Sequence, residues 1–187
     1  MKWFISDLHF CHDRNFIYIP RNFNSVYEMN EVLVKNINEK VSWADDLYIL
    51  GDCFLNNNEE GMKLMKQLPG TKYIIWGNHD TDARKEMLMN AGLDFICLGY
   101  ANILKYNKYT FYLCHYPTLT DNYDSHKPLE KRVLSISGHT HSHEIWDAAG
   151  GYNVAPEAHN NYPVSIEEII EAFKIKEKIN RDPGLTF

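Results

Sequence analysis

The segment Tyr73-Ile74-Ile75-Trp76-Gly77-Asn78-His79-Asp80 joins a short apolar run to a glycine and three side chains that bind metals or exchange protons. Runs of this length, rich in β-branched and aromatic residues, are typical of buried strands. In open α/β sheets, functional sites lie at the carboxyl ends of the strands. The segment therefore predicts a buried strand whose end carries chemically active residues.

Four other fragments repeat this arrangement of an apolar run followed by residues of metal-ligand type. They are Asp7-Leu8-His9, Gly51-Asp52, Cys114-His115 and Gly138-His139-Thr140-His141. A random arrangement would not place Asp, His and Asn at the same point of each strand. We therefore expect the five fragments to meet at one edge of the fold and to form a two-metal hydrolase site.

The composition bounds the fold and the partners. With 187 residues, the chain has the usual size of one domain, so we predict a single domain over residues 1–187 with residues 181–187 as a surface extension. The net charge of −6 argues against long nucleic acid as a partner. The first residues show neither a signal peptide nor a membrane span, so a cytoplasmic location is expected. The four cysteines form no C-x-x-C pair and are expected to be small buried thiols.

The periodicity of apolar residues divides the chain into two halves. In the first half, strands at residues 2–6, 47–50 and 72–76 alternate with helices near 25–42, 58–68 and 81–90. The second half has predicted strands at 94–98, 100–106, 109–114, 133–137, near 145–146 and at 152–154, then a helix from 166 to about 179 with Ser165 as its N-cap. This order predicts an α/β fold of the α+β four-layer type, in which two packed mixed β-sheets are flanked by helices.

The five fragments together resemble the motifs of the calcineurin-like metallophosphoesterase family, in the family's order from Asp7 to His141. The start Asp7-Leu8-His9-Phe10-Cys11-His12 and the late Pro163-Val164-Ser165-Ile166-Glu167-Glu168 also resemble a small bacterial and phage subgroup. Between them, Ala155-Pro156-Glu157 departs from the Gly-Val-Asp-like sequence of that subgroup. The environment of His159 is therefore the part of the site that the resemblance describes least well.

The resemblance implies a dinuclear metal site with Asp52 as the bridging ligand. One metal would be held by Asp7, His9, Asp52 and His141. The second metal would be held by Asp52, Asn78, His115 and His139. His79 would not bind metal but would stabilise the phosphoryl charge or protonate the leaving oxygen, with Asp80 orienting its ring.

Phosphate-ester hydrolysis at neutral pH needs a hydroxide nucleophile, charge neutralisation on the phosphoryl oxygens and a proton for the leaving group. Two cations roughly 3.5–4 Å apart supply the first two of these. Carboxylate and imidazole ligands suit Mn, Fe and Zn, and Mn²⁺ is the expected activator in vitro. We therefore expect a phosphodiesterase that hydrolyses a small phosphodiester or nucleotide by in-line attack of a metal-bridged hydroxide.

Other readings of the same motifs stay open at this point. A phosphodiester or cyclic nucleotide is favoured as the substrate, and a phosphomonoester, a phosphoprotein or a short oligonucleotide end is the alternative. An alternative from a different functional class is a catalytically silent metal-binding scaffold, although such scaffolds typically lose the catalytic histidine or several ligands. A structural zinc protein fits less well, since the cysteines lack zinc-site spacing.

Several further side chains are candidates for contact with the substrate. Those nearest the motifs are His12, Arg14, Arg84 and His143, for which surface positions or ion pairs are comparably good explanations. Residues 116–130 read as a long polar loop, in which Tyr116 and Tyr123 are candidates for a base-stacking wall. His126 and His159 are expected to be solvated loop histidines.

Overall fold

The computed structural model describes residues 1–119 and 124–181. Its first sheet has the strand order β4-β3-β2-β1-β9. The strands are β1 (Lys2–Ile5), β2 (Asp46–Leu50), β3 (Thr71–Ile75), β4 (Phe95–Gly99) and β9 (Val164–Ser165). The strands β1 to β4 run parallel to their neighbours, whereas β9 is antiparallel to β1, so the sheet is mixed.

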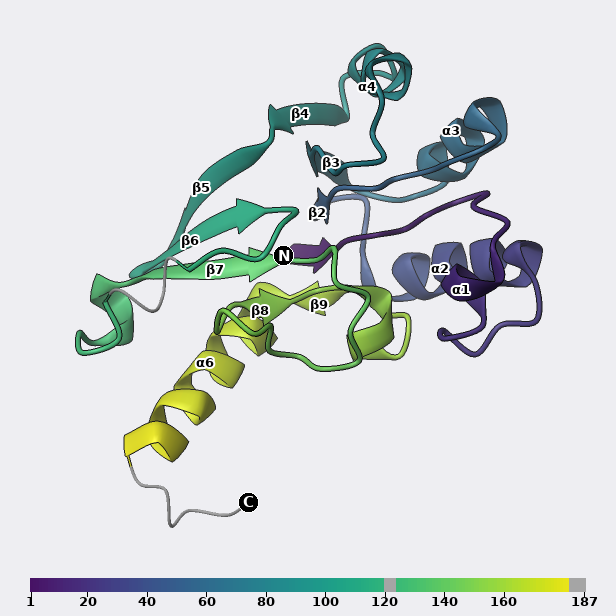
Figure 1. The fold of residues 1–187 in the computed structure, drawn as a ribbon. Coiled ribbons are helices and arrows are strands. Elements are labelled where there is room, and N and C mark those ends of the chain that lie inside the picture. The colour runs from purple at the N-terminus through teal and green to yellow at the C-terminus, as the bar shows by residue number, and fades with distance from the viewer. Residues whose placement is uncertain (120–123, 182–187) are drawn as a thin grey trace.

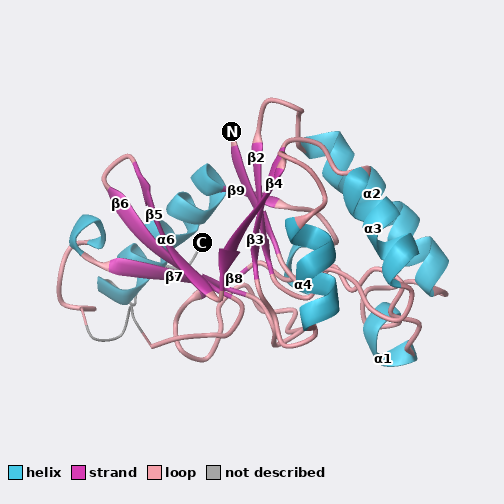
Figure 2. Cartoon of the chain, turned by 90° about the horizontal axis from the view of Figure 1, so that it is seen from above, coloured by secondary structure: helices cyan, strands magenta, loops and turns pink. Residues whose placement is uncertain are grey.

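Three helices cover one face of this sheet (Figure 2). They are α2 (Val26–Lys40), α3 (Asn58–Lys66) and α4 (Asp82–Met89). The start of α2 is fixed by Ser25, whose hydroxyl accepts a hydrogen bond of 3.2 Å from the Glu28 amide. The apolar side of α2, including Met29, Leu33 and Ile37, is fully buried against the sheet in the first of two hydrophobic cores.

The second sheet has the strand order β5-β6-β7-β8. Its strands are β5 (Ala101–Tyr106), β6 (Tyr109–Cys114), β7 (Val133–Ser137) and β8 (Tyr152–Asn153). The strands β5 and β6 form the predicted antiparallel hairpin, which turns at Asn107 with a φ of 51°. The strands β6, β7 and β8 run parallel, so this sheet is mixed as well.

The second core lies between the two sheets and includes the last helix, α6 (Ile166–Arg181) (Figures 1 and 2). Phe4 of the first sheet, Phe111 of the second and Phe173 of α6 are all buried in it. Ser165 caps α6 as predicted, because its hydroxyl accepts a hydrogen bond of 3.2 Å from the Glu168 amide. The predicted architecture of two mixed sheets flanked by helices is confirmed.

The structure differs from the prediction in its short elements. Four short elements were not expected, since each has too few residues to show periodicity. They are the strand β9 and the turns α1 (Asn15–Tyr18), η1 (Leu129–Lys131) and η2 (Pro156–His159). The predicted strand near residues 145–146 is wrong. In the described part of the chain, Trp146 forms only an isolated bridge with Tyr152, and its ring packs onto the rings of Tyr152 and Phe173, at 5.2 and 5.0 Å between centroids.

Arg181 is the last residue of α6 rather than the start of an extension, and residues 182–187 lie outside the described residues. Among the described helices, none combines the length and the apolar character that a membrane crossing needs.

Candidate metal centre

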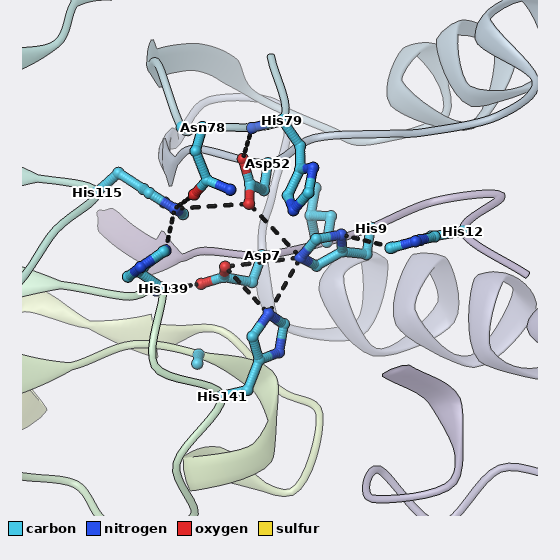
Figure 3. A network of polar contacts seen from close by, with 12 residues as sticks. Asp7, His9, His12, Asp52, Asn78, His79, His115, His139 and His141 are labelled. Atoms are coloured by element: carbon cyan, nitrogen blue, oxygen red, sulfur yellow. Dashed lines mark hydrogen bonds and ion pairs between the residues drawn. The ribbon is translucent and has the colours of Figure 1, made fainter. Parts of the chain in front are cut away.

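The five predicted fragments meet at one edge of the fold. Each fragment follows the end of β1, β2, β3, β6 or β7, and within each sheet these strands are parallel, so their carboxyl ends face the same way. Figure 3 shows that the side chains of the seven proposed ligands point toward one another. They are Asp7, His9, Asp52, Asn78, His115, His139 and His141.

Hydrogen bonds between the loops hold this edge together. The His139 amide donates to the Asp7 carboxylate at 2.8 Å, which joins the two sheets. The His79 amide donates to Oδ1 of Asp52 at 2.8 Å, which joins the loops after β2 and β3. The ligand loops are therefore positioned by contacts that need no metal.

The backbone at the ligands is unusual. Five of the seven have a φ in the left-handed region, from 48° to 71°. These residues are Asp7, His9, Asp52, His139 and His141. Non-glycine residues adopt this conformation uncommonly, at a cost of roughly 1–3 kcal/mol each, and such strain clusters at functional sites. The conformation turns each ligand back over its strand end.

Two glycines permit the ligands to approach the backbone closely. A Cβ at Gly77 would overlap the carboxylate of Asp52, and a Cβ at Gly138 would overlap Asp7 and Ser6. Any side chain at these positions would therefore displace a proposed ligand. This explains, in physical terms, why glycine precedes Asn78 and His139.

The ligand atoms form two groups. In the first, Nε2 of His9 and Nε2 of His141 lie 3.2 Å apart, and Oδ1 of Asp7 lies 3.7 and 3.6 Å from them, respectively. In the second, Nε2 of His115 lies 3.0 Å from Oδ1 of Asn78 and 3.1 Å from Nδ1 of His139. Asn78 cannot be protonated or charged, so its oxygen is available as a ligand at any pH.

Asp52 lies between these two groups. Its Oδ2 is 3.6 Å from Nε2 of His9 in the first group and 3.5 Å from Nε2 of His115 in the second. Asp7 also comes close to Asp52 and His115, but its Oδ1 faces both histidines of the first group and its Oδ2 is bonded to the His139 amide. Asp52 is thus the carboxylate with one histidine of each group beside the same oxygen.

The remaining ring nitrogens fix which histidine atoms face the centre. Nδ1 of His115 donates to the carbonyl of Leu50 at 2.8 Å, so a neutral ring has an unprotonated Nε2. Nδ1 of His141 lies 2.7 Å from the carboxylate of Glu157, with the same consequence. Each ring, when neutral, therefore presents a nitrogen lone pair to the other ligands, which is the form that binds metal.

Burial and close contacts together set the protonation states of His9 and the two carboxylates. Burial lowers the pKa of His9 to about 4, so the ring is neutral at pH 7. Burial alone would raise the pKa of Asp7, but the close contact with His9 and the nearby imidazoles hold that pKa well below its usual value. Burial raises the pKa of Asp52, and the neighbouring Asp7 raises it further. Two buried carboxylates thus share one site.

Divalent cations fit this set of donors. Oδ1 of Asp7 is buried and has no hydrogen-bond partner among the described residues. A buried carboxylate oxygen without a partner is costly, and the facing imidazole nitrogens repel one another unless a proton or a cation lies between them. Cations at the two groups would satisfy the Asp7 oxygen and the nitrogen lone pairs together.

His79 lies beside the ligands without joining either group. Its ring centroid is 5.5 Å from that of His9 and 6.0 Å from that of His12. The expected role of Asp80 in orienting the His79 ring is wrong. The buried carboxylate of Asp80 instead accepts hydrogen bonds of 2.8 to 3.1 Å from the amides of Gly77, Asp52 and Cys53, so it holds two ligand loops in place.

The four candidates for substrate contact have different positions. His12 lines the same pocket as the ligands, with Nδ1 3.1 Å from Nδ1 of His9. Arg84 donates to the His79 carbonyl at 2.6 Å and to Asn58 at 3.0 Å, which argues against the predicted phosphate contact. Arg14 and His143 are exposed and do not line this pocket, so their substrate contacts stay predictions.

The predictions for the remaining histidines and tyrosines also have different outcomes. His126 is exposed, as expected, but His159 is not a solvated histidine. Its Nε2 donates to the Asn153 carbonyl at 2.6 Å and its ring stacks on Tyr152. Tyr116 packs against the His139 ring at 4.7 Å, whereas Tyr123 lies outside the described residues.

Sequence reasoning missed a buried ion pair behind the centre. Arg21 is 1% exposed and donates to the Asp7 carbonyl and to Glu157, both at 2.8 Å. Glu157 in turn lies beside His141, as described above. Nothing in the sequence around Arg21 indicates this role. For Glu157, the available signal was that Ala155-Pro156-Glu157 departs from the sequence of the subgroup, because the departure introduces a carboxylate shortly after the last motif.

We predict that Glu157→Gln weakens metal binding by about 10–100-fold, the usual effect of losing a carboxylate that orients a ligating histidine. It should also lower the free energy of unfolding by about 3–5 kcal/mol, because the buried Arg21 loses its counter-charge. Titration of the metal-free protein and chemical denaturation measure the two effects.

Glu177→Gln is the matched control, since Glu177 pairs with the largely buried Arg132 at 2.9 Å and has no contact with the proposed ligands. It should reduce stability and leave metal affinity unchanged. Equal metal affinities in the two variants would mean that Glu157 does not act through His141.

The ligands open into a pocket of about 320 Å³. Its lining includes His79 and His12, together with the apolar residues Phe16 and Ile17 of α1. This volume is near the lower end of the usual range for small-molecule sites, about 300–1,000 Å³.

Comparison with known proteins gives a family match over most of the chain. Residues 2–156 match the model of the calcineurin-like phosphoesterase superfamily domain. The uncharacterized protein MJ1445 of Methanocaldococcus jannaschii is 32% identical over 189 residues, which cover 95% of this chain and 96% of that protein.

Two solved structures are similar to the chain. A protein of unknown function from Aquifex aeolicus, AQ665, has a TM-score of 0.70 and 27% identity, covering 92% of this chain and 98% of its own. A structure described as a novel archaeal phosphodiesterase has a TM-score of 0.51 and 16% identity, and the match covers 90% of this chain and 94% of that one. The second likeness, at this identity, shows the fold alone.

Proposed function

Because the chain belongs to the calcineurin-like phosphoesterase superfamily, we propose that it is a metal-dependent phosphodiesterase acting on a small phosphodiester or a nucleotide. The observation that carries the proposal is the position of Asp52, whose Oδ2 lies 3.6 and 3.5 Å from one histidine of each ligand group. Carboxylates in such positions bridge pairs of metals in hydrolytic sites.

The proposed cofactors are two divalent cations, with Mn, Fe or Zn suited to the mixture of carboxylate, amide and imidazole ligands. When bound, such a pair supplies a nucleophile from water and neutralises charge on the phosphoryl oxygens. The first would be held by Asp7, His9, Asp52 and His141. The second would be held by Asp52, Asn78, His115 and His139.

The protein's own residues do the rest of the proposed chemistry. Two hydrogen bonds fix the backbone of His79: its amide donates to the Asp52 carboxylate, and its carbonyl accepts from Arg84. Its protonated ring would therefore meet the leaving oxygen in a constant position, and the proton on Nδ1 or Nε2 would pass to that oxygen and leave the ring neutral. In-line attack by water from the opposite side of the phosphorus would follow from that placement of the acid.

The size of the pocket and the charge of the chain support a small substrate. A pocket of about 320 Å³ holds a phosphoryl group with one modest organic substituent on each side. The net charge of −6 favours a small substrate over long nucleic acid.

The alternative proposal, a silent metal-binding scaffold, accounts less well for His79. A scaffold needs the ligands but has no use for an additional imidazole held by two backbone hydrogen bonds next to them. The two functions make different predictions for turnover.

The test is hydrolysis of bis-p-nitrophenyl phosphate by metal-free protein to which Mn²⁺, Zn²⁺, Fe²⁺ or Mg²⁺ is added, with p-nitrophenyl phosphate as the monoester comparison. We expect turnover that requires added metal and favours the diester. Protein that binds the metals and turns over neither ester would be a scaffold. Preference for the monoester would overturn the choice of diester while keeping the hydrolase.

A further inference from the structure

An apolar ring stands at the edge of the metal pocket. Phe16 of α1 is 69% exposed and lines the same pocket as the ligands and His79. Single exposed apolar residues are common, so exposure alone has no meaning. Its neighbour Ile17, however, is 3% exposed and anchors α1 in the first core, which holds the backbone that carries Phe16 at the edge of the pocket.

Phe16 is connected to His79 by a row of rings. The Phe16 ring meets the His12 ring edge to face, with centroids 5.8 Å apart and an interplanar angle of 89°. The His12 ring is in turn 6.0 Å from the His79 ring. The wall of the pocket next to His79 is therefore made of His12 and Phe16.

The opposite end of the ligand row is different. Figure 3 shows His12 at one end of the row and His115 and His139 at the other. At that far end Tyr116 packs on His115 and His139, at 5.1 and 4.7 Å between ring centroids. A distinct ring thus lies at each end of the ligand row, and of these two rings only Phe16 lines the pocket together with His79.

We propose that Phe16 forms the subsite for the leaving group, and that the leaving alcohol carries a planar aromatic group. This inference rests on the proposed function, in which His79 gives its proton to the leaving oxygen. The leaving oxygen must then lie beside His79, so the organic group attached to it extends over His12 toward Phe16. An exposed phenyl ring there offers an edge or face to an aromatic group and no hydrogen bond to a polar one.

The test compares two diesters, methyl phenyl phosphate and methyl hexafluoroisopropyl phosphate. Both keep a methyl group on the phosphate after hydrolysis, and their leaving alcohols have similar acidity. Phe16→Ala should lower kcat/KM for the phenyl ester by about 3–10-fold, mainly through KM, and leave the fluoroalkyl ester within about twofold. Phe16→Tyr keeps a ring and should restore the preference for the phenyl ester.

Ile19→Ala is the matched control, since Ile19 is also apolar, at the end of the same turn and 55% exposed, but does not line the pocket. This substitution should leave kcat/KM unchanged for both esters. Equal losses on both esters in Phe16→Ala, or no loss on either, would overturn the subsite while leaving the hydrolase intact. Failure of the unaltered protein to hydrolyse either ester would instead count against the proposed function.

Discussion

Asp52→Asn should abolish most of the activity, with kcat/KM for bis-p-nitrophenyl phosphate falling by about 10³-fold or more. The asparagine oxygen can still accept the hydrogen bond of the His79 amide, and asparagine tolerates the φ of 56° at this position. The fold should therefore persist. What is lost is the negative charge beside His9 and His115, on which both proposed cations depend.

Asp7→Asn is the comparison that isolates the bridging role. Asp7 is equally buried and has a similar φ of 49°, but its ligand oxygen faces two histidines of one group. Its loss should mainly weaken the first cation, so Asp52→Asn should be at least about tenfold more damaging in Mn²⁺. Near-normal activity of Asp52→Asn, or a larger loss in Asp7→Asn, would show that the bridge is assigned to the wrong carboxylate.

His79→Ala should retain both metals and lose about 10²–10⁴ in rate on a diester with a poor alkoxide leaving group. Metal retention is expected because the contact between His79 and Asp52 is made by the backbone amide, which alanine keeps. An activated nitrophenyl ester needs little protonation as it departs, so its hydrolysis should fall less. Rates on the two ester types and the metal content of the variant are the measurements.

Three outcomes for His79→Ala have distinct meanings. Equal losses on both ester types would mean that the imidazole stabilises phosphoryl charge and does not act as an acid. Loss of metal would make His79 a ligand. Unchanged rates on both esters would remove His79 from the mechanism.

The strands and the ligand types could be predicted because each signal is local. The run Tyr73 to Trp76 is apolar and β-branched, and the motif that follows it is contiguous in sequence, so neither depends on distant residues. The parallel pairing of β1, β2 and β3 then brings the motif ends together, as the rule for open sheets predicts.

The parts that could not be predicted depend on contacts between residues far apart in the chain. Asp80 directly follows His79 within the third motif, which suggested that it is the partner of His79. Its carboxylate turns instead to the loop amides of Asp52 and Cys53, a contact that only the folded chain creates. Arg21 and Glu157, separated by most of the chain, pair behind the ligands with no pattern that links them in sequence.

We propose that seven side chains hold two metal ions with Asp52 between them. Titration of metal-free protein with Mn²⁺, with bound metal measured by elemental analysis, tests this arrangement. We predict saturation at two ions per chain, and reduced affinity for both ions in Asp52→Asn. Saturation at a single ion, or an Asp52→Asn protein that still binds two ions with unchanged affinity, would contradict it.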